Sequence, residues 1–138
     1  MLSFYGSWAS VLRKRTLSDT LFNRNYNKLE AMFQISNMDS AYYYVNVLSK
    51  HKNPDYIEHF YIYIAKSQYF YYIGKVDSAL YYNDQALKLT QKTSQLSNQE
   101  LSLVYRKKSL FQFTNGQNQE AKNSIKQAIE NDKSDRCV

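Results

Sequence analysis

Residues 69–89, with the sequence YFYYIGKVDSALYYNDQALKL, constrain the fold more than any other stretch of the chain. Apolar residues at helical spacing lie on both sides of Gly74, which indicates that one helix ends there and a second begins within three residues. Glycine suits this turn because it adopts the left-handed backbone conformation without steric cost. The segments before and after this one resemble it. The chain is therefore expected to fold as a stack of helical hairpins.

Composition favours an all-α fold. The chain of 138 residues has one proline and three glycines, and because both residue types break helices, long helices are permitted almost everywhere. A chain of this size buries roughly 65–70% of its unfolded surface, so a core can form without metal ions or disulfides. The single cysteine, Cys137, has no second cysteine with which to pair.

Apolar residues recur at steps of three and four along six segments, which is the spacing of one face of a helix. The clearest of these stripes consists of Phe22, Tyr26, Leu29 and Phe33. Residues 97–100, SNQE, are typical of a capping box that starts a helix. We expect six main helices in three units of about 19–50, 54–91 and 97–131. They form one domain over residues 1–132, with an additional N-terminal helix over 2–15 and a disordered tail over 133–138.

The three units repeat one another. After each hairpin turn stands an alanine, and these alanines, Ala41, Ala79 and Ala121, are 38 and 42 residues apart. Tetratricopeptide repeats have a period of about 34 residues, and the excess falls in the connections between units, where insertions are tolerated. Small residues also recur within the second and third units, as Gly74, Ala79 and Ala86 and as Gly116, Ala121 and Ala128. The chain therefore resembles the tetratricopeptide-repeat family over about residues 19–132. The runs 39–44 and 77–82 are similar to repeat modules of regulatory proteins of Bacteroidetes-type bacteria.

The resemblance implies a stack of three antiparallel hairpins, an α-solenoid, whose concave groove is lined by the first helix of each pair. Such a groove binds a peptide or an amphipathic helix, so the implied function is non-catalytic protein–protein interaction, as a scaffold or as part of a regulator. The positions that match the family's groove predict peptide contacts at Tyr26, Tyr61, Ile64, Gln68, Tyr71, Tyr72, Arg106 and Leu110. Tyr71 and Tyr72 fit the groove and the core equally well. For Tyr61, Leu103 and Phe113 the core is the favoured interpretation.

Nothing in the sequence indicates catalysis, a cofactor or a bound metal. It contains no glycine-rich phosphate loop, no G-x-S-x-G elbow and no H-E-x-x-H motif. The two histidines, His51 and His59, are eight residues apart, too far for ligands on one helical turn. No segment approaches the roughly 18 consecutive apolar residues of a membrane span, and the N-terminal residues do not follow the pattern of a signal peptide. We therefore expect a cytoplasmic protein that is not an enzyme.

The net charge of +6 leaves a second hypothesis open, a basic helical protein that associates with nucleic acid. Its basis is two short basic runs, residues 13–15 and 106–108, together with tyrosines that could stack on bases. Consecutive residues on a helix point in different directions, so a solvated face is the favoured interpretation of each run. An exposed N-terminal helix with Trp8 unburied would favour self-association.

Overall fold

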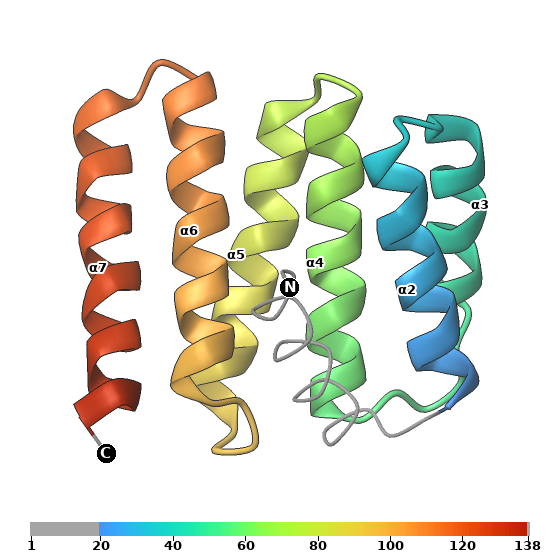
Figure 1. The fold of residues 1–138 in the computed structure, drawn as a ribbon, viewed down its shortest axis with the longest axis horizontal. Helices are drawn as coiled ribbons and strands as arrows, with labels where there is room; N and C mark the ends of the chain where they lie inside the picture. Colours follow the sequence, from blue (N-terminus) through green and yellow to red (C-terminus); the bar gives the residue numbers. More distant parts are fainter. Residues whose placement is uncertain (1–19, 138) are drawn as a thin grey trace.

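The computed structural model describes residues 20–137, with side chains as far as Lys133, and this part of the chain is helical apart from short connections. The predictions for the N-terminal helix over 2–15 and for Trp8 lie outside the described residues. The six helices are α2 (Leu21–Gln34), α3 (Met38–Ser49), α4 (Tyr56–Tyr72), α5 (Val76–Lys92), α6 (Asn98–Thr114) and α7 (Asn118–Cys137) (Figure 1). No strand occurs among residues 20–137. The all-α prediction is confirmed.

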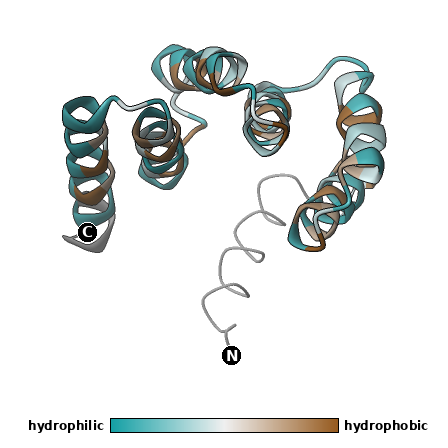
Figure 2. Ribbon diagram, turned by 90° about the horizontal axis from the view of Figure 1, so that it is seen from above, coloured by the Kyte–Doolittle hydropathy of each residue, from teal (hydrophilic) through white to brown (hydrophobic). Residues whose placement is uncertain are grey.

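The helices pack as three successive hairpins, α2–α3, α4–α5 and α6–α7. Seen from above, they follow an arc with α2, α4 and α6 on its inner side and α3, α5 and α7 on its outer side (Figure 2). Each hairpin contacts the next through α3 with α4 and through α5 with α6, and α2 also contacts α4. This packing is consistent with a helical repeat.

The three hairpin turns have the same geometry. In each, the residue that precedes the second helix donates its backbone N–H to a carbonyl five residues earlier, at 2.9 Å for Asn37, 2.8 Å for Lys75 and 2.8 Å for Gln117. The residue just before the donor has a positive φ, which is 83° at Gly74 and 81° at Gly116. In the first hairpin Ser36 adopts φ 58° without the benefit of glycine. The repeat seen in the sequence is therefore also a repeat of backbone conformation.

Small and apolar side chains fill the spaces between the helices. The alanines that mark the repeat, Ala41, Ala79 and Ala121, are buried, as are Ala86 and Ala128. The predicted stripe of α2 is buried at all four positions, and it joins a core that continues through α3, α4, α5 and α6. The predicted capping box at Ser97 and Glu100 is present. Helical periodicity thus identified both the helices and much of the core.

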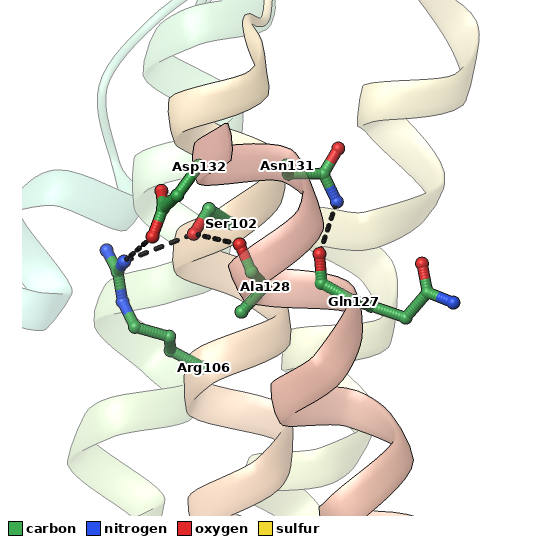
Figure 3. A network of polar contacts seen from close by, with 6 residues as sticks. All are labelled: Ser102, Arg106, Gln127, Ala128, Asn131 and Asp132. Carbon is green, nitrogen blue, oxygen red and sulfur yellow. Dashed lines mark hydrogen bonds and ion pairs between the residues drawn. The ribbon is translucent and has the colours of Figure 1, made fainter. Parts of the chain in front are cut away.

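The last helix differs from its prediction. It extends to Cys137, six residues beyond the end expected near Asn131, so the expectation of a disordered tail is wrong for the backbone of residues 133–137. No proline or glycine interrupts residues 118–137. A guanidinium nitrogen of Arg106 also lies 3.2 Å from a carboxylate oxygen of Asp132, which ties this end of α7 to α6 (Figure 3).

Candidate interaction surfaces

Three of the eight predicted peptide contacts are core residues. Tyr26, Tyr61 and Ile64 are all buried. The rings of Tyr26 and Tyr61 meet edge to face with centroids 5.2 Å apart, and the Tyr61 hydroxyl donates to a carboxylate oxygen of Glu100 at 3.4 Å. These contacts join α2, α4 and α6. The burial of Tyr61 agrees with the core interpretation favoured for it. The assignment of Tyr26 and Ile64 to an open groove is corrected, because the inner helices pack against one another along this line.

Two other predicted residues belong to a row of aromatic rings that connects α2, α4 and α6 near their C-terminal ends. The ring of Phe33 lies 5.0 Å from that of Tyr72, which lies 5.8 Å from Tyr71, which lies 5.0 Å from Phe111. Phe33 and Phe111 are buried, Tyr71 is half-buried, and Tyr72 is 47% exposed. The four residues come from α2, α4 and α6, and we call them the ring row. Tyr72 is its accessible member.

Tyr71 connects the ring row to the core. Its ring packs against buried Phe111, and its hydroxyl oxygen accepts a hydrogen bond from the Thr114 hydroxyl at 3.4 Å. Of the two interpretations left open for Tyr71 and Tyr72, the core therefore describes Tyr71 better, whereas Tyr72 lies at the surface.

Lys107 of α6 reaches α4, where its Nζ donates a hydrogen bond to Oε1 of Gln68 at 3.1 Å. Burial lowers the pKa of Lys107 to about 8; the carboxylate of Glu30 opposes this shift and the charge of Arg106 adds to it. Gln68, a predicted peptide contact, thus has a partner within the protein. The interpretation of residues 106–108 as a solvated face is wrong for Lys107. Arg106 points instead to α7, so the run forms no single basic patch.

We expect Lys107 to make the protein more stable at pH 9 than at pH 7, by about 1 kcal/mol. Its pKa is about 8 in the folded protein, below the ordinary value of 10.5 that applies to the unfolded chain. Between these values the unfolded state binds more protons, so stability rises with pH. Urea unfolding at both pH values measures the change in free energy.

The matched variants are Lys107→Met and Lys126→Met. The first should abolish the rise, because it removes the titrating amine. The second changes an exposed position on α7 and should retain the rise. An equal rise in both variants would assign the pH dependence to other groups.

The remaining two predicted contacts, Arg106 and Leu110, line a hollow between α6 and α7. Its volume is about 610 Å³, and the lining consists of Arg106, Ser109, Leu110, Phe113, Asn118, Ala121, Lys122 and Ile125. We call this hollow the end groove. Arg106 is held at its edge by hydrogen bonds to Asp132 at 3.2 Å and to Ser102 at 3.1 Å (Figure 3). Ser102 in turn donates to the carbonyl of Ala128 at 3.1 Å, so both helices position the guanidinium.

Phe113 is a further correction. It was expected in the core and is 66% exposed at the end groove. Within residues 20–137 no helix lies beyond α7 to cover this side of α6, so the apolar face at this position stays open. A helical stripe in the sequence identifies an apolar face without showing whether another helix covers it.

The histidines have local partners. Nε2 of His51 lies 3.4 Å from the Glu58 carboxylate, and the ring of His59 stacks on Tyr63 with centroids 4.7 Å apart. Burial lowers the pKa of His59, helped by the positive charges of Lys66 and Lys92. Among residues 20–133, whose side chains the structure describes, no group of three or more side chains is suited to hold a metal ion.

Among the helices described, none combines the length and the apolar character that crossing a membrane requires. Comparisons with protein-family models, with curated proteins and with solved structures give no match for this chain.

Proposed function

We propose that this chain is a tetratricopeptide-like helical-repeat module that binds a peptide segment of a partner protein on the inner side of its arc, without catalysis. The repeated turn geometry and the buried alanines at equivalent positions support the assignment to this kind of repeat. A binding module of this kind acts as a scaffold or as the recognition part of a regulator.

The observation that carries the proposal is the ring row, with exposed Tyr72 supported on both sides by packed rings. Tyrosine offers a large amphipathic contact area at a small cost in conformational entropy, and it is enriched among residues that dominate binding energy. Its neighbours hold the Tyr72 ring in place before a ligand arrives. An apolar or aromatic side chain of an extended peptide would pack against this ring.

The binding residues proposed here are fewer than those inferred from sequence. Tyr72 provides the apolar contact, and the Tyr71 hydroxyl beside it, whose oxygen accepts from Thr114, can donate its hydrogen to a peptide carbonyl. Gln68 already bonds to Lys107, so its use by a ligand would require an exchange of partners. Nucleic acid, the second hypothesis, gains no support from residues 106–108, whose first two side chains point to different helices.

The test is selection of peptides from a random displayed library at 0.5 M salt, followed by affinity measurements with two variants. Tyr72→Ala removes the proposed contact, and Tyr81→Ala is its matched control, because Tyr81 is 58% exposed on the outer helix α5. Tyr72→Ala should weaken binding by about 30-fold, equivalent to the roughly 2 kcal/mol of a residue that dominates an interface. Tyr81→Ala should change the affinity less than about twofold.

Two results would contradict the proposal. One is an equal loss of affinity in both variants, which would show that Tyr72 has no special role. The other is the absence of selected peptides together with binding of nucleic acid that weakens steeply as salt is raised, which is the behaviour expected of phosphate contacts.

A further inference from the structure

The end groove has an apolar floor that is open to solvent. Leu110 and Phe113 of α6 and Ile125 of α7 line it and are exposed large apolar residues, and Ile129, also exposed, lies one turn further along α7. Ile125 and Ile129 are four residues apart, so they share one face of α7. Single exposed apolar residues are ordinary, whereas a group that lines one hollow marks a surface suited to binding.

The preceding hairpin shows what covers a surface of this kind. When the sequences of the two hairpins are aligned at Gly74 and Gly116, each of these four apolar residues matches a residue of α4 or α5. Leu110, Phe113, Ile125 and Ile129 correspond to Gln68, Tyr71, Asn83 and Leu87.

Three of these four corresponding residues contact helix α6, and the fourth is buried. Gln68 bonds to Lys107, and Tyr71 packs on Phe111. The side chain of Asn83 donates from Nδ2 to the carbonyl of Val104 at 3.1 Å, and Leu87 is buried. The occupant of this surface in the preceding hairpin is thus an α-helix.

The end groove is less polar than the corresponding surface of the α4–α5 hairpin. Ile125 occupies the position of Asn83, and Leu110 occupies the position of Gln68. Two of the polar residues that attach the preceding hairpin to α6 therefore have apolar counterparts in the end groove. A helix in the end groove needs an apolar stripe and no polar group at these two points.

The charge of the groove indicates which polar side chains the bound helix would carry. The lining includes two cations, of which Arg106 is already paired with the carboxylate of Asp132 at the edge of the groove, so exposed Lys122 supplies the positive charge that a ligand meets. A helix that carries acidic side chains beside its apolar stripe would complement both the floor and the edge.

A second copy of the chain would complement the charge of the end groove poorly. The exposed side of α2, at the opposite end of the described stack, carries Arg24 and Lys28 between Leu21 and Ile35. Head-to-tail association would bring these cations towards Arg106 and Lys122. The net charge of +6 also opposes association of two copies.

We infer that the end groove binds an amphipathic helix of a different protein, with an apolar stripe flanked by acidic side chains. This surface is separate from the ring row, and the inference does not rest on peptide binding there.

The probe is a synthetic helical peptide of 18 residues, labelled with a fluorophore, with leucines along one face and glutamates beside them. A matched peptide has lysine in place of every glutamate. Fluorescence anisotropy at 0.15 M salt should show at least tenfold tighter binding of the glutamate peptide to the wild-type protein. Leu110→Ser and Ile125→Ser should each weaken that binding at least tenfold. Lys122→Glu should reduce or reverse the preference for the glutamate peptide.

Two control variants localise the effect. Leu21→Ser, which changes an exposed leucine of α2, and Tyr72→Ala, in the ring row, should each leave the affinity within about twofold of wild type. Circular dichroism and the urea midpoint establish that each variant is folded. If either serine variant unfolds, Lys122→Glu at its exposed position decides the question.

Equal affinity for the two peptides, or no binding of the glutamate peptide up to 1 mM, would overturn the inference. So would unchanged binding in both serine variants and in Lys122→Glu. Light scattering that reveals a dimer dissociated by Ile125→Ser would assign the groove to a second copy and would also overturn it.

Discussion

Phe60→Ala is expected to lower the free energy of unfolding by about 3–5 kcal/mol. Phe60 is 0% exposed in α4, the helix that contacts α2, α3 and α5, and its ring meets that of Tyr61 edge to face at 5.1 Å. Truncation would leave a cavity between packed helices that can close only in part. A domain of this size has a total stability of roughly 5–15 kcal/mol, so the variant should lie close to the limit of folding at 37 °C.

Phe113→Ala is the matched control, because the same residue type is 66% exposed in α6. It should change stability by less than about 0.5 kcal/mol. Urea unfolding followed by circular dichroism measures both variants. A large loss in Phe113→Ala would show that this ring is covered in solution, and a small loss in Phe60→Ala would contradict the packing of α4.

Asn83→Asp is expected to cost about 3–5 kcal/mol at pH 7. Asn83 is 1% exposed, and its Nδ2 atom donates to the backbone carbonyl of Val104, which joins α5 to α6. The substitution keeps the size of the side chain, replaces that donor with an acceptor and places a negative charge in the core next to a carbonyl oxygen.

The cost should fall as pH is lowered. Burial raises the pKa of the introduced carboxyl group in the folded state, so the folded state binds more protons than the unfolded state between the two pKa values. The stability of the variant is therefore greatest at pH values below the pKa of this carboxyl group in the unfolded state. It is lost as pH rises through the pKa of the group in the folded state. When protonated, the group can also donate to Val104 again.

Unfolding at pH 4.5 and at pH 7, each relative to wild type, measures this change. Asn123→Asp, at an exposed position on α7, should show a difference of less than about 0.5 kcal/mol at both pH values. A cost for Asn83→Asp that is the same at the two pH values would contradict burial of this side chain.

Helical periodicity was sufficient to predict the fold class and five of the six helices closely, because apolar residues three and four apart must share a face. The stripe from Phe22 to Phe33 illustrates this, since all four of its members are buried. The end of α7 was missed because polar residues continue a helix without any apolar signal. There the interaction of Asp132 with Arg106 connects two positions 26 residues apart, which no local pattern reveals.

The candidate site was harder to predict than the fold. Tyr61 and Tyr72 are both tyrosines on the inner helix α4, yet one is buried against Tyr26 and the other is exposed. Exposure depends on which neighbouring helix covers a position, and that is decided by contacts between hairpins. Lys107 was missed for the same reason, because its partners Gln68 and Glu30 belong to other helices. Leu110 and Arg106 were predicted as peptide contacts of the concave groove, and they are exposed but lie at the end groove.

The order of the helices along the arc also affects how the chain folds and how it opens locally. Among residues 20–137 the principal contacts join helices that follow one another, apart from the contact of α2 with α4. Closing such short loops costs little entropy, and chains dominated by local contacts fold in microseconds to milliseconds. Helix α4 has neighbours on both sides, whereas α7 packs principally on α6. Helix α7 lies at one end of the described stack, so its local opening disturbs one principal helix–helix interface. A helix bound in the end groove would add a second interface to α7 and would slow hydrogen exchange at its backbone amides.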